Sequence, residues 1–426
     1  MTSSKDAKNA ITLPLKPFNA PIKKERLNIK NKQRANLLPW RGQFSPQLVE
    51  EILLAYYPGS GIILDPFLGS GTLLSEAARI GAPAIGSEIN PAAFMLSKMH
   101  TFANLDIECR QKVLLEAESV LTKSQHSPLS GAKAFHIPLE LRETGRNNDT
   151  CVIEPYVDLL LSVFQLLSYS VPNKTTLWKR LSFFIINLPY SKHPLKVVLA
   201  DARRLPLKEN SIEFILTSPP YVNVMNYHHQ HRLGVEKLGW NVLEAAKSEI
   251  GSNRKFRQNR FLTVIQYVLD MALAFLEMTR VARNHARIVL VVGRSSKVLG
   301  VQFSNSKLLA ELATSLGFEL HLRQERVFQN RYGKNIYEDI LNITPSATLK
   351  AMSSDEALEK AREVALSALS EAKRHVPQKN IKLLKEAIQQ IESVQPSPIF
   401  DPNSAKPSNL QAELLEEVSP LTRNYL

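Results

Sequence analysis

The sequence has 426 residues and a formal net charge of +13, with 44% hydrophobic and 22% charged residues. This length allows one large domain with additions or two domains, and the apolar content supports a substantial core. The positive charge favours a polyanionic partner such as a nucleic acid. The only cysteines, Cys109 and Cys151, are too few for a disulfide framework or a four-thiolate zinc site, so a reducing, cytoplasmic compartment is expected.

Nothing in the sequence predicts an association with membranes. The chain begins Met-Thr-Ser-Ser-Lys without an apolar segment, so no secretory signal is predicted. The apolar runs are much shorter than the roughly 20 residues that cross a bilayer, so no transmembrane helix is predicted either. The sequence gives no indication of the oligomeric state.

Residues 1–36 are rich in lysine and arginine, and their only acidic residues are Asp6 and Glu25. Prolines and the lack of sustained periodicity predict an arm or an irregular lead-in here. Such a segment either contacts a polyanion or is a solvated basic tail.

Residues 44–90 carry the most informative succession of elements. An amphipathic helix is predicted over 44–56, with Ser45 as its N-cap. The short apolar run 62–64 predicts a buried strand. The glycines within 69–71 then allow the backbone to turn tightly and approach a ligand closely.

The turn leads into a helix from Thr72 and a second strand, 84–87, that ends at Glu88. This is the layout of a nucleotide-binding unit, in which Glu88 accepts hydrogen bonds from ribose hydroxyls. The loop has neither the G-x-G-x-x-G pattern nor the lysine of a P-loop, so a ligand without a pyrophosphate fits better. Asp65 can accept from an ammonium, and loop amides can donate to a carboxylate. S-adenosylmethionine has these parts, whereas a glycine turn in an unrelated α/β protein is the alternative.

After residue 104 the next strand is predicted only at 196–200, a gap longer than an ordinary α/β connection. Leucine-rich stretches within the gap predict a folded, helical insertion over 105–194. The rest of the pattern predicts an α/β fold with a seven-stranded, mostly parallel sheet and a C-terminal pair of helices. Strands are expected at 212–216, 288–292, 320–328 and 336–343, and helices at 262–282, 308–316, 353–374 and 379–393.

Four candidate site residues follow predicted strands, namely Asp65, Glu88, Asp201 and Ser218. Ligands of parallel α/β sheets collect at the carboxyl ends of strands. We therefore expect a single site to gather all four side chains.

The run Ser-Pro-Pro-Tyr at 218–221 suits transfer of a group to an aromatic amine. The amino nitrogen of cytosine or adenine is a poor nucleophile, because its lone pair is delocalised into the ring. Two acceptors aimed at its N–H bonds, the Ser218 side chain and a carbonyl left unpaired by Pro219-Pro220, would restore that lone pair. Tyr221 offers a stacking face for a base turned out of a helix. Such a transfer is direct and needs neither a metal nor a covalent intermediate.

Residues 65–72, Asp-Pro-Phe-Leu-Gly-Ser-Gly-Thr, resemble motif I of the amino-methylating DNA methyltransferases, and 217–221 resemble their Thr-Ser-Pro-Pro-Tyr motif. The resemblance implies a Rossmann-like class I methyltransferase fold with S-adenosylmethionine as cofactor. It also implies that Trp40, Arg41, Gly42 and Phe44 form a short element over the methionine end of the cofactor. Asp201-Ala202 resemble a motif that meets the adenine ring of the cofactor. The implied catalytic residues are Ser218, Pro219, Pro220 and Tyr221. The implied cofactor-binding residues are Phe44, Asp65, Pro66, Phe67, Gly69, Ser70, Gly71, Thr72, Glu88, Ile89, Asp201 and Ala202.

The Ser-Pro-Pro-Tyr form is typical of the cytosine-N4 branch of that family, whereas adenine-N6 enzymes more often have Asp or Asn first. Enzymes acting on cytosine carbon-5 need a cysteine after a proline, which neither cysteine here has. The resemblance thus implies a partner of double-stranded DNA with the target base flipped out, in a restriction-modification or defence role. An adenine-N6 enzyme, an RNA amino-methyltransferase and a catalytically inactive DNA-binding subunit are the alternatives.

The predicted parts are a basic arm (1–36), a catalytic domain (37–104 and 195–350), the insertion (105–194) and a C-terminal helical extension (351–426). The short stretch between Asp201 and Ser218 leaves no room for a recognition domain. Target reading is therefore expected in the insertion, in the C-terminal helices or in the basic segment 222–260.

Three histidines, His228, His229 and His231, raise the possibility of a metal site. No further set of Cys or acidic ligands accompanies them, so neutral histidines in a loop near DNA are the preferred interpretation and no metal is predicted. The stretch 227–233 also resembles a Tyr-x-x-x-His-x-Leu segment that follows the catalytic motif in some of these enzymes.

Overall fold

The computed structural model describes residues 15–30, 32–125, 152–223, 226–252, 256–330, 332–347 and 349–407. Parts of three predicted segments lie outside the described residues: the start of the basic arm (1–14), the middle of the insertion (126–151) and the end of the C-terminal extension (408–426).

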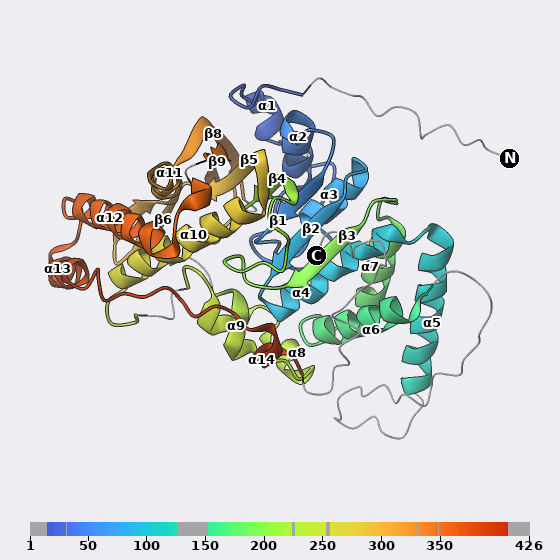
Figure 1. Cartoon of the computed structure of the whole chain (residues 1–426). Helices are drawn as coiled ribbons and strands as arrows, with labels where there is room; N and C mark the ends of the chain where they lie inside the picture. Colours follow the sequence, from blue (N-terminus) through green and yellow to red (C-terminus); the bar gives the residue numbers. More distant parts are fainter. Residues whose placement is uncertain are drawn as a thin grey trace.

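A seven-stranded sheet forms the centre of the protein (Figure 1), with the order β3-β2-β1-β4-β5-β9-β8. The first five strands are parallel, and β9 lies antiparallel between β5 and β8. The predicted Rossmann-like class I sheet is thereby confirmed. Its strands are β1 (Ile62–Asp65), β2 (Ala84–Glu88), β3 (Leu195–Leu199), β4 (Ile212–Thr217), β5 (Ala282–Gly293), β8 (Phe318–Gln329) and β9 (Asn335–Pro345).

The parallel strands are apolar on both faces because helices cover both. In β1 the side chain of Ile63 packs into one core, whereas Ile62 and Leu64 pack into a second core on the opposite face. On the Ile63 side lie α2 (Pro46–Tyr56), α3 (Thr72–Arg79), α4 (Pro91–Lys98) and η1 (Met99–Asn104). The opposite core contains α10 (Phe261–Val281), α11 (Asn305–Leu316), α12 (Ser354–Ala372) and α13 (Ile381–Gln389).

The described part of the insertion is helical and extends the first core. It consists of α5 (Ile107–Gln125), α6 (Glu154–Ser168) and α7 (Lys174–Ile186). Arg110 on α5 is buried and donates to six backbone carbonyls, among them those of Phe102 and Leu188. The insertion is thus joined to η1 by buried hydrogen bonds as well as by apolar packing.

The described part of the basic N-terminal segment lies against the sheet. Ile22, just before the short helix α1 (Lys24–Leu27), and Leu27, the last residue of α1, are buried. The backbone of Leu27 accepts from Arg326 on β8, and Asn28 accepts from the Val327 amide. This stretch therefore packs along an edge strand, which the basic composition of 1–36 did not predict.

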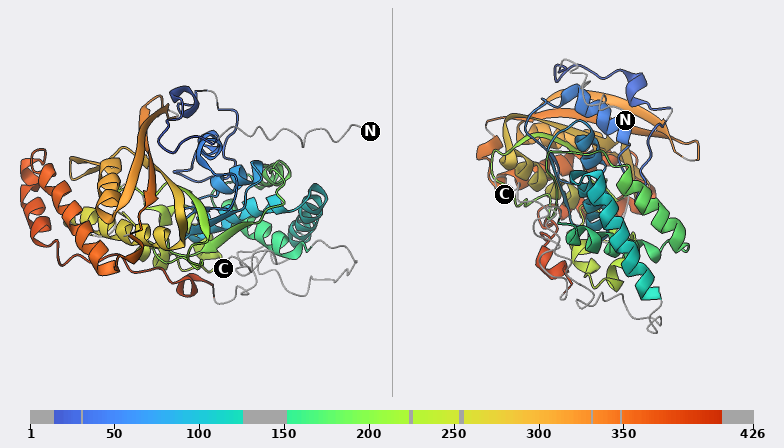
Figure 2. Two further views of the ribbon diagram at one scale, coloured as in Figure 1. Left: turned by 45° about the horizontal axis from the view of Figure 1, so that its top comes forward. Right: turned by 90° about the vertical axis from the view of Figure 1, so that its right-hand side faces the viewer.

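Smaller elements complete the fold, which Figure 2 shows in two further views. The segment after β4 forms η3 (Tyr227–His229), α8 (Arg232–Lys237) and α9 (Val242–Ser248). The remaining elements are the hairpin β6 (Ser295–Val298) and β7 (Val301–Ser304), the turns η4 (Leu349–Ala351) and η5 (Gln378–Asn380), and the last helix α14 (Pro402–Ala405).

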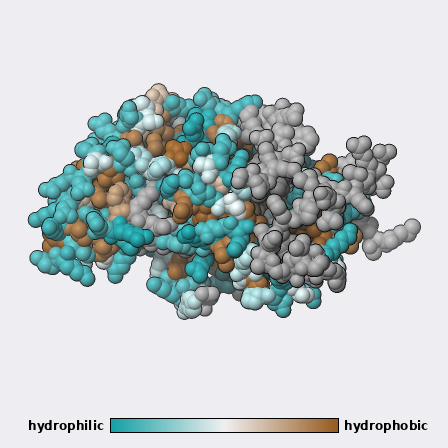
Figure 3. Space-filling model, turned by 90° about the horizontal axis from the view of Figure 1, so that it is seen from below, coloured by the Kyte–Doolittle hydropathy of each residue, from teal (hydrophilic) through white to brown (hydrophobic). Residues whose placement is uncertain are grey.

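Among the described residues, α10 is the one helix long and apolar enough to span a membrane by length and composition. Its most apolar window is 83% buried inside the protein, as expected of a core helix. On the face drawn in Figure 3, small apolar areas interrupt a mainly hydrophilic surface.

Candidate active site

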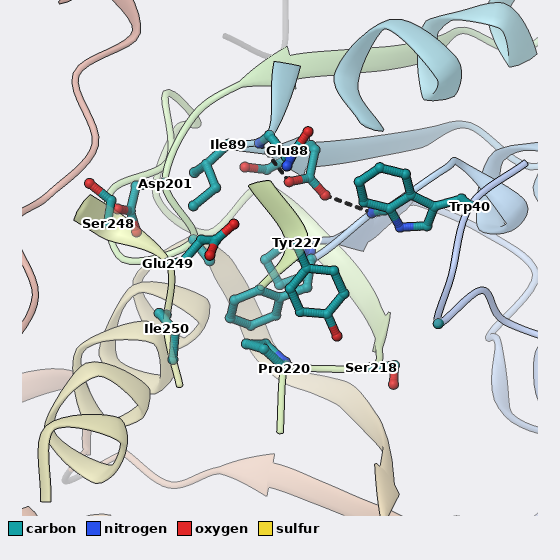
Figure 4. Close-up of a pocket in the computed structure, with 17 residues that line it drawn as sticks. Trp40, Glu88, Ile89, Asp201, Ser218, Pro220, Tyr227, Ser248, Glu249 and Ile250 are labelled. Atoms are coloured by element: carbon teal, nitrogen blue, oxygen red, sulfur yellow. Dashed lines mark hydrogen bonds between the residues drawn. The ribbon is translucent and has the colours of Figure 1, made fainter. Parts of the chain in front are cut away.

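A cavity opens where the carboxyl ends of the parallel strands meet (Figure 4). Nine predicted site residues line it, and they come from the ends of β1, β2, β3 and β4. These are Pro66, Phe67, Gly69, Glu88, Ile89, Asp201, Ala202, Ser218 and Pro220. The convergence of distant strand ends therefore occurs as the parallel topology predicts.

Glu88 joins the end of β2 to the glycine loop. One carboxylate oxygen accepts from the Gly69 amide at 2.9 Å, and the other accepts from the Asn90 amide at 2.8 Å. Burial raises the pKa of Glu88 to about 7, against the lowering effect of these amides. Glu88 thus holds the loop in place while its carboxylate faces the cavity.

The glycine loop is supported from behind by a buried histidine. His100 donates from Nε2 to the Ser70 carbonyl at 2.8 Å and accepts at Nδ1 from the Ser75 hydroxyl at 2.5 Å. Burial lowers the pKa of His100 to about 4, so the ring is neutral at pH 7. Gly71 has a φ of 94° and passes so close to this ring that a Cβ would lie 2.5 Å from it.

Asp65 lies behind the cavity and does not line it. The carboxylate is 1% exposed and accepts from the Phe67 amide at 3.0 Å and from the Thr217 hydroxyl at 2.5 Å. Burial raises the pKa of Asp65 to about 7. Asp65 therefore ties the ends of β1 and β4 together, next to Ser218.

Four other predicted cofactor residues lie away from the main cavity. Ser70 and Thr72 border a second, polar cavity on the other side of the loop. Ser70 accepts from Gln43, and Thr72 donates to Asn36. Gly71 is the N-cap residue before α3, and the half-buried Phe44 packs against the apolar core.

Asp201 is buried in an ion pair with Arg203. One oxygen accepts from the Arg203 amide and Nε, and the other accepts from Arg203 Nη2 at 2.7 Å and the Phe400 amide at 3.0 Å. Four donors therefore occupy this carboxylate. Its role at the cavity wall is to hold the backbone and its neighbour Ala202 in place.

Ser218 is part of the cavity lining. Its hydroxyl hydrogen is committed to the carbonyl of Val291 on β5, at 2.8 Å. Pro220 also lines the cavity, whereas Pro219 is buried in the turn. The Tyr221 ring packs against Gly293 at the end of β5, where a Cβ would lie 2.6 Å from it. Tyr221 does not line the cavity, and burial raises the pKa of its hydroxyl.

The cavity is also lined by Trp40, from the element predicted to lie over the methionine end of the cofactor, and by Tyr227 and Glu249, which the sequence analysis did not assign to the site. The rings of Trp40 and Tyr227 lie nearly parallel, with centroids 6.4 Å apart. Burial, together with Glu88 and Glu249, raises the pKa of Tyr227 to about 12. His231 donates to the Pro39 carbonyl at 2.8 Å, which connects the two segments that carry these rings.

Glu249 reaches the cavity from the loop after α9 and is held by His228. The carboxylate accepts from the His228 amide at 2.5 Å and pairs with Nδ1 at 2.6 Å. The His228 side chain is 0% exposed and belongs to η3, and the proximity of these histidines to DNA stays a prediction. Among the described residues, no group of three or more His, Cys, Asp or Glu is placed to hold a metal ion. The sequence signals for this segment were its basic composition over 222–260 and the Tyr-x-x-x-His-x-Leu resemblance over 227–233, and neither marks Glu249.

Comparison with known proteins gives a family for the first part of the chain. Residues 13–99 match the family model described as DNA methylase, of the N6 and N4 type. The type II methyltransferase M.MjaII of Methanocaldococcus jannaschii is 37% identical over 78 residues, 18% of this chain and 14% of that protein. The type II methyltransferase M.ScaI of Streptomyces caespitosus is 45% identical over 47 residues, 11% of this chain and 16% of that protein. The chain thus spans less than a fifth of the length of these curated relatives, and the resemblance to DNA amino-methyltransferases is confirmed for the motif I region.

Solved structures give a weaker likeness over more of the chain. A SAM-dependent methyltransferase from Methanosarcina mazei is 14% identical, over 68% of this chain and 94% of its own, with a TM-score of 0.32. The rRNA methyltransferase AviRa from Streptomyces viridochromogenes is 15% identical, over 77% and 91%, with a TM-score of 0.29. Because both scores are low, the fold assignment rests on the strand order.

The close approach of Gly71 to His100 predicts a specific loss of stability. Gly71→Ala should lower the free energy of unfolding by about 2–4 kcal/mol, because left-handed backbone strain adds to a clash with a fixed ring. Gly81→Ala is the matched control, since Gly81 also has a positive φ but has open space around it. Urea unfolding should show a loss of only about 1 kcal/mol for the control. Equal losses in the two variants would contradict the role of the contact with His100.

Proposed function

We propose, from the match of residues 13–99 to DNA methylases and from the site above, that this chain transfers a methyl group from S-adenosylmethionine to an exocyclic amino group in double-stranded DNA. The favoured target is N4 of cytosine. The observation that carries the proposal is that Ser218 and Pro220 open onto the same cavity as Glu88 and the glycine loop. A cofactor subsite and a pair of acceptors for an amine therefore share one space.

The residues that line the cavity fit S-adenosylmethionine. Glu88 offers carboxylate oxygens for ribose hydroxyls, and Ile89 and Ala202 offer apolar surface for an adenine ring. Gly69 lets the ligand approach the backbone of the loop. Among the described lining residues there is no lysine or arginine, whereas Glu88, Asp201 and Glu249 are acidic, which suits a cationic ligand. When bound, this cofactor supplies an electrophilic methyl group.

The target amine is activated by hydrogen-bond acceptors in the Ser-Pro-Pro-Tyr turn. Because the Ser218 hydroxyl donates to Val291, its lone pairs are the part of the group left for a substrate. With the Pro219 carbonyl they would accept from the two N–H bonds of the target amine and localise its lone pair. The Thr217–Asp65 bond fixes the strand end that carries this turn. One amine proton leaves in exchange for the methyl group.

The target base needs a stacking face within the cavity. Tyr221 can take the role expected of it only if its ring turns away from Gly293. The rings of Phe67, Tyr227 and Trp40 already line the cavity. We therefore propose that the flipped base meets Tyr227 beside Pro220, with Tyr221 supporting the turn from below.

The cytosine-N4 preference rests on the serine at position 218, and adenine-N6 is the alternative within the same mechanism. A restriction-modification role is proposed because the relatives matched are type II methyltransferases. Such a role would place the protein in the cytoplasm with DNA as its partner. Mass analysis of nucleosides from methylated DNA identifies the product directly.

Ser218→Ala should lower single-turnover methyl transfer by about 100- to 1000-fold, because it removes one of two acceptors that stabilise the transition state. Affinity for the cofactor should stay close to that of the unchanged chain. The matched control is Ser211→Ala, since Ser211 lies just before the start of β4 and its hydroxyl donates to the nearby Lys208 carbonyl. Turnover by Ser218→Ala at the rate of the control would remove the catalytic role of this motif.

Cofactor affinity should depend on pH through Glu88. Its pKa of about 7 lies above the ordinary value, so the carboxyl is protonated below pH 7 and ionised above it. An ionised Glu88 accepts better from ribose hydroxyls and attracts a cation, so affinity should rise up to about tenfold per pH unit from pH 6 to 7 and level off above. Asp65 titrates in the same range, so Glu88→Gln serves as the comparison. Calorimetry that gives the same pH profile for both proteins would show that Glu88 is not responsible.

DNA binding should weaken steeply with salt, because each phosphate contact releases counterions. Arg41 is exposed and adjoins Trp40 at the cavity, so Arg41→Gln should reduce the slope of log affinity against log salt by about one. Arg374, exposed after α12, is the control and should leave the slope unchanged when replaced by Gln. Fluorescence anisotropy with duplex DNA measures both. A slope near zero for the unchanged chain would argue against a nucleic-acid substrate.

A further inference from the structure

After α13 the chain returns across the molecule to the active site (Figure 1). We call residues 395–407 the C-terminal strap. It begins at the Gln395 carbonyl, which accepts from Gln266 on α10 at 2.9 Å. It ends beside α9, where the amide of the N-cap residue Asn241 donates to the Ala405 carbonyl at 3.0 Å.

The strap completes the coordination of a buried guanidinium. The Arg203 side chain is 0% exposed and pairs with Asp201 at 2.7 Å and with Asp270 of α10 at 2.6 Å. Its remaining hydrogens go to carbonyls, including those of Ser397 at 2.8 Å and Pro398 at 2.9 Å. Two of the acceptors of this cation are therefore backbone groups of the strap.

The strap also supplies donors to both buried aspartates. Asp270 accepts from the Ser397 amide and from the Ser397 hydroxyl, each at 2.7 Å. Asp201 accepts from the Phe400 amide at 3.0 Å. Buried charges are tolerated only when they are paired and hydrogen-bonded, so detachment of the strap would leave this network incomplete.

This network forms the back of one wall of the cavity. Asp201 and Ala202 line that wall, and the strap passes on its far side (Figure 4). The Phe400 ring belongs to a small apolar cluster with Ala245 and Ala405, against which Ile89 packs. The strap thereby contacts, from behind, residues that come from the ends of both β2 and β3.

We propose that the C-terminal strap is a positioning part of the nucleoside subsite, fixing Asp201, Ala202 and Ile89 for an adenine ring. The proposal rests on the proposed function, since it takes an adenosine-containing ligand as the occupant. Because the Asp201 carboxylate already accepts four hydrogen bonds, it acts by holding the wall and not by binding the adenine amine. Ser397 and Phe400 are then determinants of ligand affinity, although neither lines the cavity.

The test uses point variants of the full chain and calorimetric binding of S-adenosylmethionine and 5′-methylthioadenosine, which share the adenosine but differ in the amino-acid tail. Ser397→Ala should weaken both ligands about five- to tenfold, because one hydrogen bond to a buried charge is lost. Phe400→Ala should weaken both at least as much. Ser397→Thr keeps the hydroxyl and should restore most of the affinity. Ser404→Ala is the control within the strap, since its hydroxyl is exposed and donates only to Asp401.

Binding is measured well below the unfolding temperature of each variant, so that a loss of stability alone does not appear as a loss of affinity. Hydrogen exchange of the amides at 200–205 should quicken in Ser397→Ala and not in Ser404→Ala. Folded Ser397→Ala and Phe400→Ala with unchanged affinity for both ligands would overturn the proposal while the proposed function stands. Failure of the unchanged chain to bind either ligand would overturn the cofactor assignment and the strap's role together.

Discussion

Buried carboxylates at the ends of parallel strands need hydrogen-bond donors, and much of the geometry of this protein meets that need. Glu88 accepts hydrogen bonds from the amides of Gly69 and Asn90, and Asp65 accepts one from the Thr217 hydroxyl. Each bond also joins two segments that the ligand must find at a fixed separation. The Glu88 carboxylate that faces the cavity therefore also holds the glycine loop. A change in the charge of Glu88 would alter the position of the loop as well.

The sheet and the main cavity could be predicted because their signals are local in sequence. The apolar run before Asp65, the glycines after it and Glu88 lie within one strand-turn-helix-strand unit, and parallel topology brings Ser218 to the same edge. The donors to Asp201 could not be predicted in the same way. Phe400 is 199 positions away, and no periodicity or motif marks an exposed-looking, proline-containing tail as the partner of a buried acid.

The residue types of the Ser-Pro-Pro-Tyr turn predicted its polar groups, but they did not predict where its aromatic ring lies. The Ser-Pro-Pro-Tyr run predicted an acceptor at Ser218, and in the structure this residue lines the cavity while its hydroxyl donates to Val291 on β5. The expected stacking ring, Tyr221, instead fills the space above Gly293. The Tyr221 ring can occupy this space because Gly293 on β5 has no side chain. The sequence around Tyr221 does not reveal that Gly293 is its neighbour, since tertiary structure brings the two together.

The apolar helix α10 connects the loop after β3 with the C-terminal strap. Its polar residues Gln266, Asp270 and Glu277 are spaced by four and seven positions and so lie along one stripe. Gln266 and Asp270 bind the strap, and Glu277 accepts from the Leu205 amide just after the Asp201 turn. The same stripe thus orients the loop after β3 and the returning C-terminal segment. The helix resembles a membrane span in composition because it is buried inside the protein. Its few polar side chains form the hydrogen bonds that hold the C-terminal strap and the loop after β3.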